Sequence, residues 1–224
     1  MKEQYLIIDI ETIPNEKAEK PEFDESKVLL GNLKDPAKIA AKVEAEKERH
    51  EAGLTKKMSL SSDMCRIISI GYMLVEYNSG RHIKISDGVM FGEFGDKEIL
   101  EKFTQLYIYQ LSSPRIVGWN SKGFDIPVIW KRCILQGVQP PFKPMKICQK
   151  YSSAGSVDLM HVWNNYEMGS LKNACKALGI EAKSGMDGLM IYDAFKEGRF
   201  DEIKKYNLED CNACFEIMQK IGEV

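Results

Sequence analysis

The order of the β-rich runs constrains the fold more than any other feature of this sequence. Three such runs come before the chain begins to alternate between strand and helix patterns, and they cover residues 5–11, 65–77 and 81–91. The last two are joined by Asn78-Ser79-Gly80, a turn-like connection. This order predicts an α/β fold with a mixed central β-sheet flanked by α-helices.

The later segments show the alternation of strands and helices. A helix is expected after Asp96, a short apolar strand at 116–119, and a second helix from about 127 to 136. Further helices are expected from Ser170 to Gly179, over 187–196, and from Asp201 to about 221. Ser170 and Asp201 are predicted to cap the helices that they open.

Residues 15–64 form a charged insertion after the first strand. Its first 44 residues, 15–58, hold ten acidic and ten basic side chains. Asp35-Pro36 predicts a helix start, with proline at the first helical position, and the helix should run to about Ala52. It has one narrow apolar stripe, so we interpret it as a solvated helical insertion; a lid or substrate clamp is the functional alternative.

Length and charge exclude several classes of protein. The chain has 224 residues, 31 Lys and Arg against 33 Asp and Glu, and a formal charge of -2. We expect residues 1–224 to form a single domain that carries the 15–64 insertion. The longest apolar runs are far short of the ~20 residues of a membrane span, and we expect a cytoplasmic protein with no membrane partner. The balanced charge argues against a surface coated in basic residues to hold nucleic acid.

The six cysteines are too dilute for a disulfide scaffold. Cys211 and Cys214 form a C-x2-C pair inside a strongly helical stretch, without a second close pair. We interpret the cysteines as small apolar core residues rather than zinc ligands.

Two acidic residues lie at the C-terminal end of the first predicted strand. Asp9 and Glu11 are two residues apart, so both side chains leave the same face of the strand. Two neighbouring carboxylates repel each other and are costly to desolvate, and a divalent cation would remove that penalty. Hard oxygen ligands of this kind suit Mg²⁺ or Mn²⁺. An Asp-x-Glu pair that is merely exposed at a strand end is the alternative.

A second polar group follows the strand at 116–119 and opens a helix. Asp125 stands where a helix N-terminus stabilises negative charge, and an ordinary capping acid is the alternative interpretation. Asn120 offers a donor and an acceptor at the same loop, and Phe124 offers an aromatic face for a base.

The third group lies in the last helix. Tyr206 and Asp210 are four residues apart, so the phenol and the carboxylate share one helix face. This spacing lets the acid hold a metal while the hydroxyl orients an attacking water. Two unrelated surface residues are the alternative. Glu209 is expected to face solvent.

In this order, the three groups resemble the motifs of the DEDD superfamily of 3′–5′ exonucleases, whose fold is ribonuclease H-like. Asp9-Ile10-Glu11 is similar to the first motif, Asn120 to Asp125 to the second, and Tyr206-x3-Asp210 to the third. The chain resembles the subgroup that has tyrosine in the third motif. The other subgroup has histidine five residues before the last Asp, where this chain has Lys205. Within the tyrosine subgroup the chain resembles the proofreading exonuclease domain of family B DNA polymerases and the stand-alone predicted exonucleases related to it.

The resemblance implies phosphodiester hydrolysis with two divalent cations, Mg²⁺ or Mn²⁺. The implied metal ligands and catalytic acids are Asp9, Glu11, Asp125 and Asp210, and Tyr206 would orient the attacking water. The implied substrate-binding residues are Thr12, Ile13, Asn120, Phe124 and Lys183, with Ile13 and Phe124 packing on the terminal base. The products would be nucleoside 5′-monophosphates.

The implied substrate is the 3′ end of single-stranded or frayed DNA. Two alternatives stay open: an exoribonuclease of the same superfamily, and a nucleic-acid-binding module that has lost catalysis. No polymerase module fits in 224 residues, so any proofreading with replication or repair proteins would occur in trans. Asp158 is expected either to support the site from behind or to cap a helix.

Overall fold

A five-stranded mixed sheet forms the centre of the protein. The computed structural model describes residues 3–111, 113–181 and 185–222. Within these ranges the strands are β1 (Glu3–Pro14), β2 (Cys65–Asn78), β3 (Arg81–Phe91), β4 (Arg115–Gly118) and β5 (Ser156–Asp158). Their order is β3-β2-β1-β4-β5; β1–β2 and β2–β3 pair antiparallel, whereas β1–β4 and β4–β5 pair parallel. The predicted mixed sheet is confirmed.

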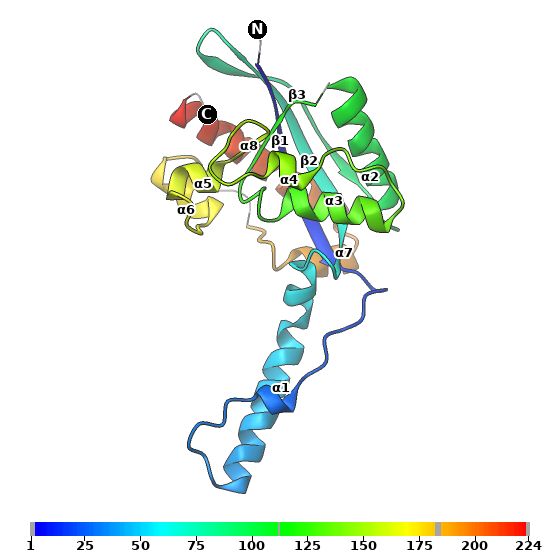
Figure 1. Ribbon diagram of the computed structural model, residues 1–224, viewed down its shortest axis with the longest axis vertical. Helices are drawn as coiled ribbons and strands as arrows, with labels where there is room; N and C mark the ends of the chain where they lie inside the picture. Colours follow the sequence, from blue (N-terminus) through cyan, green and yellow to red (C-terminus); the bar gives the residue numbers. More distant parts are fainter. Residues whose placement is uncertain (1–2, 112, 182–184, 223–224) are drawn as a thin grey trace.

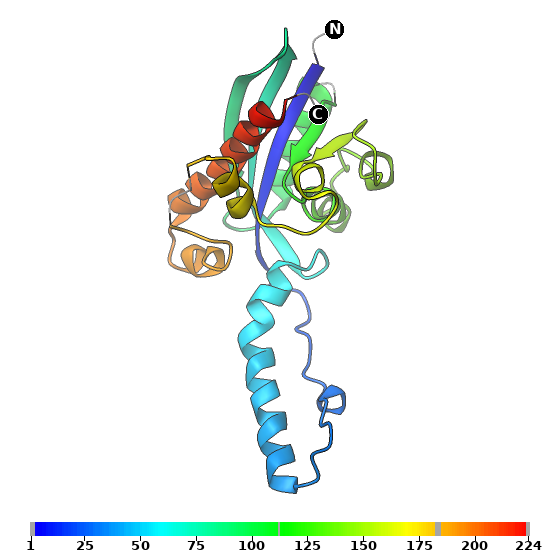
Figure 2. The same cartoon turned by 90° about the vertical axis from the view of Figure 1, so that its left-hand side faces the viewer.

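Helices cover both faces of this sheet (Figures 1 and 2). Along the chain they are α1 (Pro36–Ser59), α2 (Lys97–Thr104), α3 (Asp125–Leu135), α4 (Pro144–Ile147), α5 (Leu159–Asn164), α6 (Leu171–Ala177), α7 (Ile191–Lys196) and α8 (Phe200–Ile221). A short 3₁₀ turn, η1 (Glu25–Lys27), precedes α1, and a π-helical segment, η2 (Gln105–Gln110), continues α2. No helix in the described ranges is long and apolar enough to cross a membrane.

The alternation of side chains along β1 divides the core into layers. Leu6, Ile8 and Ile10 pack with residues of α2 and α3 in one buried cluster. Tyr5 and Ile7 point to the opposite face and pack with residues of α6 and α8. Because side chains alternate with a period of two, the odd-numbered positions that follow Ile7 also face the α8 side of the sheet. This parity determines where the acids of β1 point.

The insertion forms an arm that extends away from the sheet (Figures 1 and 2). Its helix α1 begins as predicted, with the Asp35 carboxylate accepting from the Ala37 N–H at 2.9 Å. It ends at Ser59 rather than near Ala52, so the predicted end is wrong. Gly53 does not stop the helix, and the last turn is anchored in the domain by Met58, which is 4% exposed.

Two other predicted helix boundaries also differ. The last helix begins at Phe200 with Arg199 as its N-cap, so Asp201 lies in the first turn instead of capping it. The helix expected over 187–196 begins only at Ile191, because Asp187 forms a turn whose carboxylate accepts from the Leu189 N–H at 2.8 Å. The Ser170 cap is confirmed: its Oγ accepts from the Asn173 N–H at 3.1 Å.

The C-x2-C pair lies in the core. Cys211 and Cys214 are both buried in the cluster between α8 and the sheet. Cys65 and Cys133 are buried on the opposite face, where burial raises the pKa of each thiol to about 12. These thiols therefore stay protonated at neutral pH and pack as small apolar groups.

Candidate active site

Three carboxylates meet where the end of β1 lies against α8. One carboxylate oxygen from each of Asp9, Glu11 and Asp210 lies within 4.8 Å of the others. Glu11 and Asp210 are each only 8% exposed, so water solvates these charges poorly. Like charges this close together, two of them buried, are unfavourable unless a cation offsets them, and carboxylate oxygens are the ligands that Mg²⁺ and Mn²⁺ prefer. The donor set therefore fits a divalent cation.

A register shift in the sheet occurs next to these acids. Glu11 pairs with Ser69 of β2, whereas Thr12 pairs with Ile67, so that Ile68 is an extra residue on β2. Such β-bulges increase the local twist and redirect side chains, and they are frequent beside active sites.

Asn207 of α8 fixes the Asp9 carboxylate. Its Nδ2 donates to the Asp9 backbone oxygen at 3.0 Å and to Asp9 Oδ2 at 2.6 Å. Its Oδ1 accepts from the Ser69 hydroxyl at 2.6 Å, and both Asn207 and Ser69 are 0% exposed. One buried amide thus ties α8 to β1 and β2 at the first acid. Asn207 is not among the site residues that the sequence predicts.

A glycine in β2 allows this close contact. A Cβ added to Gly71 would lie 3.0 Å from the Asn207 backbone oxygen and 3.1 Å from its side chain. Glycine inside an apolar strand often marks the close approach of another backbone, so this signal was present in the sequence. The approach brings α8, with Tyr206 and Asp210, against the acids of β1.

The fourth predicted acid, Asp125, lies beside the cluster at the start of α3. Its Oδ1 accepts from the Ile10 N–H at 3.0 Å, and Ile10 stands between Asp9 and Glu11 on β1. The pairing of β4 with β1 extends only to Ile7, so the carboxylate takes the place of a strand partner. Burial, and next the charge of Asp9, raise the pKa of Asp125. The contact with β1 goes beyond the role of an ordinary capping acid.

Tyr206 lies half-buried one helical turn before Asp210. Burial raises the pKa of its phenol, and the charges of Glu11 and Asp9 raise it further. The phenol is therefore protonated at neutral pH and close enough to these carboxylates to feel their charge. Glu209 is also half-buried, with its carboxylate 3.8 Å from Lys205 Nζ, so the expectation that it simply faces solvent is wrong.

Asp158 fixes the 120–125 loop by accepting hydrogen bonds from its backbone. Asp158 Oδ1 accepts from the Asn120 N–H and Oδ2 from the Lys122 N–H, each at 3.0 Å. Asp158 also caps α5 by accepting from the Met160 N–H at 3.1 Å. Both expected roles of Asp158, support and cap, are therefore combined in one carboxylate.

Asn120 adopts a left-handed backbone conformation, with φ of 57°, that asparagine tolerates better than most residues. Its side chain packs against Gly123, where an added Cβ would lie 2.5 Å from Asn120 Oδ1. The loop conformation thus depends on both residues.

Only some of the predicted substrate-binding residues line the cavity beside the acids. Thr12 and Phe124 line, together with Glu11, a cavity of about 670 Å³ beside the acids. Ile13 is only 1% exposed and packs in a core cluster with Ile68 and Ile191, which leaves it no surface for the base contact that we expected. Lys183 lies outside the described residues.

Comparison with protein families gives a match over residues 58–220. The family is described as a predicted 3′–5′ exonuclease related to the exonuclease domain of PolB. The matched range contains the 120–125 loop and the Tyr206–Asp210 segment, and it begins after Asp9 and Glu11. No curated protein matches the chain.

Among solved structures, the chain is similar to the family B DNA polymerase from the hyperthermophilic archaeon Pyrobaculum calidifontis. The identity is 16%, the TM-score is 0.60, and the match covers 97% of this chain but 24% of the polymerase. A product-bound exonuclease I matches with 11% identity and a TM-score of 0.45, over 93% of this chain and 45% of its own. A zinc-bound complex of E. coli ExoI with ssDNA matches with 13% identity and a TM-score of 0.44, over 92% and 42%.

The polymerase match, at its low identity, concerns the fold, which is ribonuclease H-like. The chain spans about a quarter of that polymerase's length. The family match covers more than half of this chain. The chain therefore belongs to the family of predicted 3′–5′ exonucleases related to the exonuclease domain of PolB, which makes it a predicted phosphodiester hydrolase.

Proposed function

We propose that the protein removes nucleotides one at a time from the 3′ end of single-stranded or frayed DNA and releases nucleoside 5′-monophosphates. The observation that carries the proposal is the meeting of Asp9, Glu11 and Asp210 within 4.8 Å. A site of three crowded acids does not attract a phosphate by itself, so the proposal includes two divalent cations, Mg²⁺ or Mn²⁺.

The residues that would hold these cations are Asp9, Glu11, Asp125 and Asp210. When bound, the cations would supply charge neutralisation at the scissile phosphate and a water made more acidic. The Asn207 amide keeps one oxygen of Asp9 in place, and the Ile10 N–H does the same for Asp125. A carboxylate whose orientation is already fixed loses little entropy when it binds a ligand.

Tyr206 is proposed to orient the attacking water. Its raised pKa keeps the proton on the phenol, so the group donates a hydrogen bond and does not act as a base. Phe124 and Thr12, on the wall of the adjacent cavity, and Asn120 in the loop are proposed to contact the terminal nucleotide.

Tyr206→Phe should lower turnover by roughly 10- to 100-fold, because a poorly oriented water spends less time in line with the phosphate. Binding of Mn²⁺, measured by calorimetric titration of the protein alone, should be nearly unchanged. A variant that turns over at the wild-type rate would refute the water-orienting role.

Asn207→Ala should weaken Mn²⁺ binding by roughly 10-fold or more, because ligand-orienting contacts behind a metal site typically matter by that amount. Asn212→Ala is the matched control, since Asn212 lies on the same helix and its Nδ2 donates to the Leu208 backbone oxygen at 2.9 Å. Equal Mn²⁺ affinities for the two variants would contradict the positioning role of Asn207.

The experiment that tests the substrate compares single-stranded DNA and RNA oligomers of one sequence, labelled at the 5′ end, with Mg²⁺ or Mn²⁺ and with Asp9→Ala as the inactive control. The proposal predicts faster shortening of the DNA. Faster shortening of the RNA would replace it with an exoribonuclease. If neither strand is cleaved in Mg²⁺ or Mn²⁺, and the binding of each strand stays the same in EDTA, the proposal would be replaced by a nucleic-acid-binding module.

A further inference from the structure

The cavity beside the acids is shared between the site and the arm. Its volume is about 670 Å³. One wall holds Glu11 and Phe124. A second comes from the end of α1, with Lys56 and the C-cap residue Leu60. A third comes from the segment with Leu189 and Tyr192. The insertion thus reaches the edge of the candidate site, although most of α1 extends away from it (Figure 1).

The arm wall is fixed relative to the acids. The Thr12 hydroxyl, one residue after Glu11, donates to the Ser59 backbone oxygen at 2.7 Å. The Asn15 N–H donates to the Met64 backbone oxygen at 2.8 Å, which closes the base of the insertion. Lys131 Nζ of α3 holds Asp63 Oδ1 at 2.8 Å from the other side. Lys56 is therefore presented from a helix end that is tied to β1 and α3.

The chemistry of the walls suits unpaired nucleotides. Leu60 and Leu189 are 58% and 61% exposed, and Phe124 adds an aromatic face on which a base can pack. Lys196 Nζ lies over the Tyr192 ring, 4.6 Å from its centroid, so this ring contributes mainly its edge and its other face. The volume lies in the range of ~300–1,000 Å³ that is usual for small-ligand sites, which is the scale of single nucleotides.

Two lysines, Lys56 and Lys196, are among the described residues that line the cavity. Lys196 Nζ lies 2.7 Å from Asp193 Oδ1, so these two charges offset each other. The Asp187 carboxylate accepts from the Leu189 N–H at 2.8 Å, which orients the carboxylate but does not remove its charge. Lys56, on the arm, is exposed and lines the same cavity.

We propose that this cavity is a nucleotide subsite and that the base of the arm is a substrate clamp. Unpaired nucleotides next to the scissile bond would place their bases against the apolar wall, with a backbone phosphate at Lys56. This inference rests on the proposed exonuclease function and extends it, because it gives the charged insertion a part in holding the single strand.

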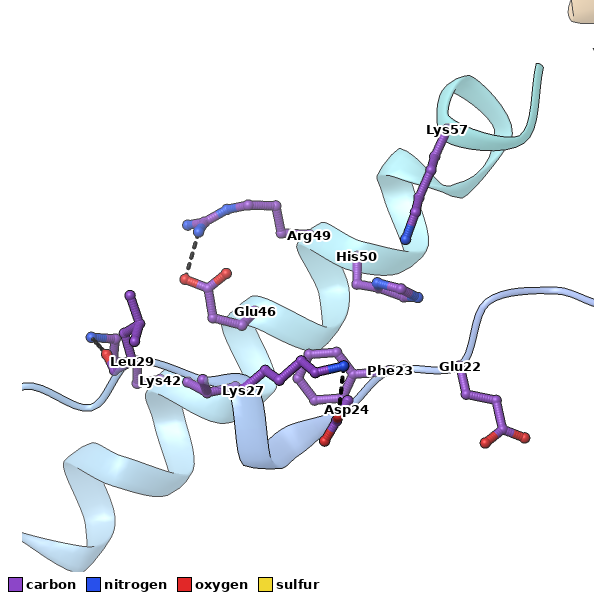
Figure 3. A pocket seen from close by; sticks show the side chains of 11 residues that line it. Glu22, Phe23, Asp24, Lys27, Leu29, Lys42, Glu46, Arg49, His50 and Lys57 are labelled. Atoms are coloured by element: carbon purple, nitrogen blue, oxygen red, sulfur yellow. Dashed lines mark hydrogen bonds and ion pairs between the residues drawn. The ribbon is translucent and has the colours of Figure 1, made fainter. Parts of the chain in front are cut away.

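The test compares charge reversal at two neighbouring lysines of α1. Lys56→Glu changes the cavity wall. Lys57→Glu is the matched control: Lys57 is also exposed, but it lines a separate hollow on the arm with Phe23 and His50 (Figure 3). Both changes are made together with Asp9→Ala, so that the strand is bound and not degraded.

The measurement is fluorescence anisotropy of a 5′-labelled oligothymidylate at several salt concentrations. Lys56→Glu should weaken binding by about 10-fold and reduce the slope of log K against log salt by ~0.7, which is the value for one lost phosphate contact on a single strand. Lys57→Glu should change the dissociation constant by less than about twofold.

Two outcomes overturn different claims. If an enzyme with Asp9 intact cleaves DNA but the two lysine variants bind alike, the subsite is wrong and the proposed function stands. If the intact enzyme cleaves no 3′ end, the proposed function is wrong, and the subsite that rests on it is wrong with it. A circular dichroism melt confirms that both variants are folded, as expected for exposed helix positions.

Discussion

Asp210→Asn should lower the rate of 3′-end hydrolysis by about 10³-fold or more while the protein stays folded. Asp210 shares the three-acid cluster with Asp9 and Glu11, and losing its charge removes one anionic ligand from a site that needs cations to accept a phosphate. Asp9→Ala should have an effect of the same size. Initial rates on a labelled oligonucleotide measure the loss.

The matched control for this prediction is Glu209→Gln. It removes the same charge one residue earlier on α8, where the carboxylate lies near Lys205 and is not a member of the three-acid cluster. The control should keep activity within about twofold of the wild type, because the Glu209 carboxylate lies beside Lys205 and outside the cluster that would hold the cations. A wild-type rate for Asp210→Asn would remove the carboxylate cluster from the mechanism.

Arg132→Ala should reduce the free energy of unfolding by ~3–5 kcal/mol, the usual result of removing one partner from a buried ion pair. Arg132 Nε lies 2.6 Å from Asp96 Oδ2, and the two side chains are 3% and 1% exposed. The pair joins α3 to the start of α2, and Asp96 also accepts from the Ile67 N–H of β2 at 3.3 Å. Without the guanidinium, the Asp96 charge is left buried.

Urea denaturation measures this loss of stability. The double variant Arg132→Met with Asp96→Asn should recover most of it, since no unpaired charge then remains in the core. Lys131→Ala, on the exposed side of the same helix, should cost less than about 1 kcal/mol. A loss of the same small size for Arg132→Ala would show that the pair does not hold α3 in place.

The main features of the site could be predicted from local patterns. Asp9 and Glu11 lie on one face of a strand because strand side chains alternate, and Tyr206 lies one turn from Asp210 because of helix geometry. The sheet followed from the order of the runs. The spacing of the acids and of the tyrosine depends only on residues close together in the chain, and the sheet depends on the order of the strands along it.

The features that could not be predicted from the sequence depend on how elements distant in the chain pack together. Asn207 stands beside Tyr206 in the sequence, but its contact with Asp9 exists only once α8 lies against β1. Ile13 points to the same face of β1 as Asp9 and Glu11, yet it is buried because Ile191 of α7 packs over it. The sequence predicts an end near Ala52, but α1 continues to Ser59 because the burial of Met58 against the domain stabilises its last turn.

The most direct test of the central claim uses a single-stranded DNA oligomer with a radioactive phosphate between its last two nucleotides at the 3′ end. With Mg²⁺, the proposed reaction predicts that the first labelled product is a nucleoside 5′-monophosphate, and that EDTA and Asp210→Asn both abolish it. Internal fragments would contradict stepwise hydrolysis from the 3′ end, and a label that stays on the shortened strand would contradict the release of a nucleoside 5′-monophosphate.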